Sequence, residues 1–158
     1  KGNYPVEAVE TMVKIALRVE SSIDYSKKFS RQKKIITDNI TDAVGHATCT
    51  TANDLNAAGI IAVSKSGFTV NQIAKFRPMC PVYAFTPDEQ VRRQLNLLWG
   101  CNPNILEDIT TSALDLFNAA AFKTFKLGGV KVGDIVVIVG GTPIGIAGNT
   151  NTLKVHCY

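Results

Sequence analysis

The sequence lacks any long hydrophobic run. No apolar stretch reaches the roughly 18 residues of a membrane-spanning helix, and residues 1–6 contain no apolar core ahead of a small-residue cleavage site. Internal repeats of 20–50 residues are also missing. We therefore expect a cytoplasmic protein without a membrane partner, and neither a solenoid nor a propeller.

Cysteine is sparse and widely spaced. The chain has four cysteines in 158 residues, and the nearest two, Cys80 and Cys101, are 21 positions apart. This spacing contains no CxxC motif and no zinc-like pairing. A domain of this length buries roughly 70% of its unfolded surface and needs no disulfides. We expect reduced, mostly buried thiols.

A strong excess of one charge is also missing. Lys and Arg outnumber Asp and Glu by 17 to 13, and 46% of the residues are hydrophobic, which excludes intrinsic disorder. The net charge of +4 suits a small anion and is too dispersed to favour nucleic acid. We interpret the densest basic segment as a solvated loop; it contains Lys27, Lys28, Arg31, Lys33 and Lys34.

The sequence does contain an alternation of amphipathic helices and short apolar strands. This alternation predicts one α/β domain over residues 1–158, with a mixed, mostly parallel five-stranded sheet flanked by helices. The last two strands are joined too directly for a helical crossover and should be antiparallel. We expect helices over residues 5–23, 38–57, 86–98 and 109–127, and a further helix that carries Val70, Ile73 and Ala74 and ends at residue 78. We expect strands over residues 60–63, 82–85, 101–106, 135–139 and 152–156.

Apolar spacing and capping signals give finer expectations for the helices. In the first helix the helical spacing is carried by Val9, Met12, Ala16, Val19 and Ile23. The second helix should end at Gly59 and bury Ile40, Val44, Ala47, Thr51 and Leu55. Thr86 and Glu89 have the spacing of a capping box, with Pro87 at the first helical position.

The first loop of possible function follows the strand at residues 60–63. A helix start exposes unpaired N–H groups and a partial positive charge, which together hold a phosphate. The loop consists of Ser64, Lys65, Ser66, Gly67, Phe68 and Thr69. Hydroxyls of Ser66 or Thr69 and the Lys65 ammonium could add to such a site. The alternative, that Ser66 is only the helix N-cap, stays open.

The second loop is rich in glycine and also follows a strand. Residues 140–150 include Gly140, Gly141, Thr142, Pro143, Gly145 and Gly148. Their spacing resembles a dinucleotide fingerprint only loosely, because no helix and no Lys-Ser/Thr pair follows. A mobile hairpin connection is the alternative. Ligands of open α/β sheets bind beyond the carboxyl ends of strands, so both loops could form one anion pocket.

Catalytic constellations are poor. His46 falls inside a helix and His156 on the terminal strand, with no nucleophile nearby in sequence, so we interpret both as structural. Trp99 is more typical of a core or an interface than of a stacking platform. The acids show no metal-binding spacing. Residue chemistry alone therefore predicts a binding domain for a phosphorylated small molecule, with no metal and no catalytic residue.

The chain resembles the C-terminal domain of pyruvate kinases, in bacterial form, over essentially its whole length. The matching segments are residues 4–12 (YPVEAVETM), 66–67, 74–78 (AKFRP), 81–86 (PVYAFT), 99–100, 133–137 (GDIVV), 140–152 and 155–156. The family's catalytic barrel and lid domain, with their magnesium and potassium sites, have no counterpart here. The resemblance thus implies an excised domain or a stand-alone relative, catalytically silent by itself.

The resemblance also implies a function and partners. In the whole enzyme, which transfers a phosphoryl group from phosphoenolpyruvate to ADP in glycolysis, this domain binds a phosphorylated allosteric effector and contributes a subunit contact. The effector loops fall on residues 64–69 and 140–148. We expect a homo-oligomer, a dimer alone and a tetramer in the parent enzyme. The alternatives are a small independent enzyme or sensor for a phosphorylated metabolite, and a purely structural module.

One departure from the family bears on the effector. Relatives activated by a bisphosphate sugar hold the second phosphate with extra basic and aromatic residues, and the segment around Leu116 and Phe117 offers no Arg or Trp. Phe68 also replaces a polar residue of the first loop. A monophosphate effector, AMP or a sugar monophosphate, is therefore as consistent with the sequence as a bisphosphate.

Overall fold

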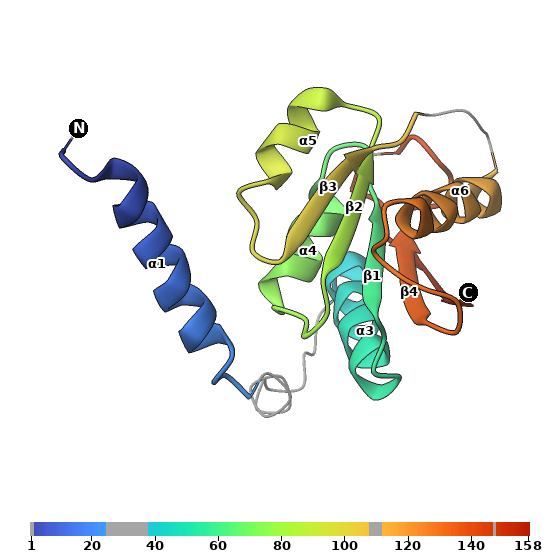
Figure 1. Cartoon of the computed structure of the whole chain (residues 1–158). Helices are drawn as coiled ribbons and strands as arrows, with labels where there is room; N and C mark the ends of the chain where they lie inside the picture. The colour runs from blue at the N-terminus through green and yellow to red at the C-terminus, as the bar shows by residue number, and fades with distance from the viewer. Residues whose placement is uncertain (1, 25–37, 108–111, 147) are drawn as a thin grey trace.

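The computed structural model describes residues 2–24, 38–107, 112–146 and 148–158 (Figure 1). The basic segment at residues 27–34 and the expected start of the last helix at residue 109 lie outside these ranges. The described part contains a five-stranded sheet in the order β3-β2-β1-β4-β5. The predicted fold class, a mixed and mostly parallel sheet flanked by helices, is confirmed.

The strands lie close to their predicted positions. They are β1 (Gly59–Val63), β2 (Val82–Thr86), β3 (Cys101–Ile105), β4 (Ile135–Gly140) and β5 (Thr152–Cys157). Parallel pairing joins β3, β2, β1 and β4. The predicted antiparallel pair of β4 and β5 is confirmed, with Val137 opposite Val155. The strand β5 therefore forms one edge of the sheet.

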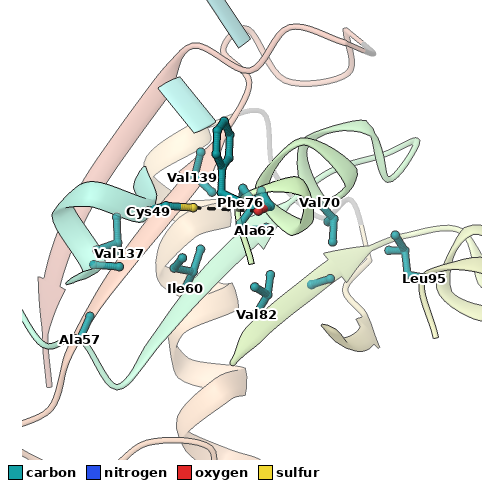
Figure 2. Close-up of a cluster of buried hydrophobic side chains, with 13 residues drawn as sticks. Cys49, Ala57, Ile60, Ala62, Val70, Phe76, Val82, Leu95, Val137 and Val139 are labelled. Carbon is teal, nitrogen blue, oxygen red and sulfur yellow. Dashed lines mark hydrogen bonds between the residues drawn. The ribbon is translucent and has the colours of Figure 1, made fainter. Parts of the chain in front are cut away.

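Helices cover both faces of this sheet (Figure 1). The helices α3 (Ile40–Asp54), α4 (Phe68–Lys75) and α5 (Glu89–Leu95) pack on one face and α6 (Ala113–Lys126) on the other. Figure 2 shows the cluster on the first face, where Ile60 and Val137 of the sheet meet Cys49 and Phe76 of the helices. Successive strand residues serve opposite faces, since Ile61 belongs to the cluster under α6.

The first helix, α1 (Pro5–Glu20), forms where its apolar spacing predicts it but buries none of its residues. Figure 1 shows it projecting from the rest of the chain. At its carboxyl end the Glu20 carboxylate accepts a hydrogen bond from the Trp99 indole N–H, at 3.2 Å. The Trp99 ring also lies 5.8 Å below the Arg77 guanidinium.

The predicted buried face of α3 is wrong. Ile40 and Leu55 are 68% and 40% exposed, and the buried residues are Thr41, Gly45, Thr48, Cys49 and Ala52. Small side chains let α3 approach α4 closely, and a Cβ at Gly45 would stand only 3.5 Å from the Phe76 ring. The large apolar side chains are displaced to the exposed sides. Gly59 does not end the helix either, because α3 ends at Asp54 and Gly59 begins β1.

The predicted capping box of α5 is also wrong. Thr86 is the last residue of β2 and is fully buried, and the N-cap is Asp88. The Asp88 carboxylate accepts from the N–H groups of Gln90 and Val91, at 2.7 and 3.0 Å. A carboxylate that satisfies two orphan donors at the positive end of a helix is a strong cap, whereas the Thr86 hydroxyl accepts from the N–H of Asp88 itself, at 3.3 Å.

The strand order places a topological switch between β1 and β4. From β1 the chain moves through α4 and α5 to β2 and β3, and then returns through α6 to β4, on the other side of β1. The connection that leaves β1, through α4, and the connection that enters β4, through α6, thus run over opposite faces of the sheet. The crevice that opens at the carboxyl ends of such strands is the usual ligand site of open α/β sheets.

Candidate functional site

The two loops predicted from the sequence meet at this crevice. Residues that follow β1 and residues that follow β4 line one hollow that is partly open to solvent. The predicted residues that line it are Ser64, Lys65, Ser66, Thr69, Gly141, Gly145 and Gly148. Gly67, Phe68, Gly140, Thr142 and Pro143 belong to the same loops without lining the hollow.

The first loop is shaped by backbone geometry. Gly67 is the N-cap of α4 and has a φ of 75°, a left-handed conformation that favours glycine. The first N–H to bond backwards belongs to Asn71 and reaches the Gly67 carbonyl at 3.0 Å. The preceding N–H groups of α4 therefore have no acceptor within the helix. Ser66 precedes the N-cap, so the interpretation of Ser66 as merely the cap is wrong.

The second loop is shaped by side-chain amides. The Asn151 carbonyl oxygen accepts from the Thr142 N–H at 2.9 Å, and the Asn151 amide donates to the Thr142 carbonyl at 2.6 Å. The Asn149 amide donates to the same carbonyl at 2.8 Å. These bonds draw the two ends of the loop together. They bring Gly141 so close to the Asn149 carbonyl that a Cβ at residue 141 would overlap its oxygen.

Three hydrogen bonds made by threonine hydroxyls attach the loops to one another and to the rest of the domain. The hydroxyls of Thr69 and Thr150 lie 2.6 Å apart and join the two loops directly. The Thr86 hydroxyl donates to the Lys65 carbonyl at 3.1 Å, and the Thr41 hydroxyl donates to the Gly148 carbonyl at 3.3 Å. The Thr86 hydroxyl therefore supports the first loop and does not cap α5.

Apolar side chains form the remaining walls of the hollow. They come from the ends of three strands, from α6 and from the second loop: Val63, Phe85, Pro87, Leu106, Leu116, Phe117, Ile144 and Ile146. Sequence reasoning missed most of this wall. Of these residues, Leu106 was the easiest to identify from the sequence as part of the site, because it directly follows a strand, as both loops do. Leu116 and Phe117, around which the sequence offers no Arg or Trp, both lie in this wall.

The polar side of the hollow carries one cation. Among the described residues that line it, Lys65 is the only Lys or Arg, and it is exposed. The hydroxyls of Ser64, Ser66 and Thr69 and the start of α4 lie on the same side. Hydrogen-bond donors, one ammonium and a helix start on one side, and apolar groups on the other, suit a ligand with one anionic end and a less polar body.

The cysteines and histidines lie away from this hollow. Burial raises the pKa of the Cys49 thiol to about 12 and that of Cys80 to about 11, so both stay protonated at neutral pH. The His46 ring meets the Phe76 ring edge-on, and the His156 ring meets Tyr158 in the same way. Burial, with the neighbouring Lys154 charge, lowers the pKa of His156. These contacts agree with structural roles.

The described ranges contain neither a candidate membrane span nor a candidate metal site. No helix within residues 2–24, 38–107, 112–146 or 148–158 combines the length and apolar character needed to cross a bilayer. The same ranges hold no group of three or more His, Cys, Asp or Glu side chains that could bind a metal ion.

Comparison with known proteins agrees with this architecture. Residues 42–156 match the family described as pyruvate kinase, alpha/beta domain. The chain is 41% identical over 155 residues to the pyruvate kinase of Clostridium acetobutylicum, covering 98% of this chain and 33% of that protein. It is 40% identical over the same length to the pyruvate kinases of Sporosarcina psychrophila and Geobacillus stearothermophilus, and covers 26% of each.

The chain thus spans about a quarter to a third of the length of these relatives. Matches at this identity over nearly the whole chain, together with the α/β architecture, identify the family of the chain. The chain belongs to the pyruvate kinase family and carries its C-terminal alpha/beta domain.

Proposed function

We propose that this chain is the effector-binding and oligomerising domain of a pyruvate kinase, and that it is catalytically silent by itself. The observation that carries the proposal is the convergence of residues 64–66 and 69 with residues 141, 144–146, 148 and 149 on one hollow at the switch point of the sheet. In this proposal the whole protein transfers a phosphoryl group from phosphoenolpyruvate to ADP, in glycolysis and in the cytoplasm. Magnesium and potassium serve a catalytic domain outside this chain.

The proposed ligand is a phosphorylated metabolite with one phosphate, such as AMP or a sugar monophosphate. The phosphate would lie against Ser66, Thr69 and the start of α4, with Lys65 nearby. A second phosphate would face the apolar wall at Leu116 and Phe117, where it would lose its hydration without gaining a cation. The charge distribution therefore favours a monophosphate over a bisphosphate.

Calorimetric titration tests this proposal. We expect AMP or glucose 6-phosphate to bind more tightly than fructose 1,6-bisphosphate, and adenosine and glucose to bind weakly. The double substitution Ser66→Ala and Thr69→Ala removes two hydroxyls, each contributing about 1.5–3 kcal/mol to a charged partner, so affinity should fall at least tenfold. Wild-type affinity of the double variant for every ligand would place the phosphate elsewhere.

A coupled assay tests catalytic silence. Purified chain supplied with phosphoenolpyruvate, ADP, magnesium and potassium should form no pyruvate. Pyruvate formation that stays with the chain through repurification would contradict the proposal, and would favour an independent enzyme.

The strand β5 supports the oligomerising role. The Tyr158 N–H donates to the Asp134 carbonyl at 3.1 Å, and hydrogen-bonded pairs alternate along antiparallel strands. The N–H groups of Leu153, Val155 and Cys157 therefore point away from β4. An open edge of this kind finds a partner unless it is blunted, and a second copy would close it by two-fold symmetry.

Sedimentation equilibrium tests the contact. Val155 is 46% exposed, so Val155→Pro should remove an outward N–H and weaken the dimer without opening the core. Val155→Thr keeps the N–H and the β-branch, and should dimerise as the wild type does. A wild-type chain that stays monomeric at about 1 mM, which corresponds to a binding free energy weaker than about 4 kcal/mol, would contradict the role of this edge.

A further inference from the structure

Thr150 is the last residue of the second loop and lies behind the hollow. It is 1% exposed and is not among the residues that line the hollow. Its hydroxyl lies 2.6 Å from that of Thr69, which is itself 5% exposed and does line the hollow. The two residues are 81 positions apart in sequence, so this bond is a long-range connection between the two loops.

A ligand that offers only acceptors would determine which of the two hydroxyls donates in this bond. Each hydroxyl has one proton and can donate once, and the bond between them can run either way. If Thr69 donated to Thr150, the Thr69 oxygen would turn its lone pairs toward the hollow, where a phosphate also offers only acceptors. If Thr150 donates, the Thr69 proton is free to point into the hollow. A phosphate that accepts a hydrogen bond from Thr69 therefore requires Thr150 to be the donor between the two hydroxyls.

We propose that Thr150 is a positioning residue of the phosphate site: its hydroxyl donates to Thr69, orients the Thr69 proton toward the ligand and holds the two loops in register. This inference rests on the proposed function, because it takes a phosphate as the ligand. It adds a residue that never touches that ligand. It also explains why a threonine is buried where the loop rejoins the sheet, two residues before β5.

Two substitutions at Thr150 distinguish the effect of its hydroxyl from the effect of its side-chain volume. Thr150→Val keeps the shape and removes the hydroxyl, whereas Thr150→Ser keeps the hydroxyl. Titrated with AMP and with glucose 6-phosphate, Thr150→Val should raise the dissociation constant about three- to tenfold, the value of one hydrogen bond between neutral groups. Thr150→Ser should stay within about twofold of the wild type.

A double-mutant cycle shows whether Thr150 acts through Thr69. Thr69→Val should itself weaken binding, and Thr69→Val with Thr150→Val should be no weaker than Thr69→Val alone, because the second hydroxyl has lost its only route to the ligand. Losses that add, or equal losses for Thr150→Val and Thr150→Ser, would overturn the inference. Urea unfolding of each variant identifies any change in binding that follows from loss of stability.

Hydrogen exchange tests the register of the loops without a ligand. In the free protein, Thr150→Val should speed amide exchange at residues 67–70 and 148–151 together, and Thr150→Ser should not. Unchanged exchange in Thr150→Val would overturn the inference. If the wild type binds neither AMP nor glucose 6-phosphate, the proposed phosphate site fails, and with it the assigned direction of the bond, whereas the exchange result still decides whether Thr150 joins the loops.

Discussion

The two loops of the site reach the same hollow by different physical means. The first loop leaves β1 and enters α4 within a few residues, so strand pairing and helix geometry determine its backbone, with Gly67 at the turn. The second loop is longer and enters no helix; side-chain amides of Asn149 and Asn151 close it. A site half built from regular backbone and half from side chains should respond unequally to substitution in its two halves.

The largest expected effect is on the second loop, from Gly141→Ala. The added Cβ would overlap the Asn149 carbonyl oxygen, so the backbone must move and the loop cannot close. We expect a loss of about 1–3 kcal/mol in the free energy of unfolding, and loss of AMP binding. Urea unfolding and calorimetry measure the two quantities.

Gly145→Ala is the matched control for this substitution. Gly145 has a φ of 90° but no atom within 4 Å of a Cβ, so the variant carries backbone strain without the overlap. If the two variants lose the same stability, the close approach at Gly141 is not what limits the second loop.

An intermediate effect is expected from Asn151→Ala, also in the second loop. Its side chain accepts from the Thr142 N–H and donates to the Thr142 carbonyl. Because these bonds are exposed, we expect a small change in unfolding free energy, about 0.5–1.5 kcal/mol, and a several-fold loss of affinity. Asn151→Asp keeps the acceptor and removes the donor, so it should fall between wild type and alanine. An unaltered affinity in Asn151→Ala would show that the loop closes without its amides.

The smallest effect is expected in the first loop, from Lys65→Ala. The ammonium is exposed, and an exposed charge contributes up to about 1 kcal/mol and is screened within roughly 8 Å at physiological salt. Affinity for AMP should fall a few-fold at low salt, and the difference should vanish at high salt. Lys131→Ala, an exposed cation that does not line the hollow, is the control. A loss of affinity that is the same at low and high salt would mean that Lys65 acts through a desolvated contact.

Local sequence signals predicted the positions of helices and strands better than which face of a helix is buried. The five strands and the antiparallel last pair followed from short apolar runs and connection length, which depend on nearby residues alone. The buried face of α3 did not follow, because Ile40 and Leu55 are apolar but face outward, while Gly45 and Thr48 are inside. Which side of a helix is buried depends on how closely its partner approaches, and that partner is distant in sequence.

The same limit applies to competing local signals. The sequence favoured Thr86 as the cap of α5, but β2 retains Thr86 in the strand and Asp88 takes the cap position. For α1, apolar spacing predicted a helix, which formed, but spacing alone says nothing about whether a surface is present to cover it. In both cases the local pattern was real and its outcome depended on tertiary context.

By itself, the sequence determined the alternation of helices and strands and the two loops rich in glycine and hydroxyl groups, because turn chemistry and apolar periodicity are local properties. Only the tertiary structure decided that β4 lies beside β1, which brings residues 64–66 and 69 and residues 141, 144–146, 148 and 149 to one hollow. It also decided that Leu106, Leu116 and Phe117 form the opposite wall and that Thr69 meets Thr150. These contacts join segments far apart in the chain, and strand order in the folded sheet is what makes them neighbours.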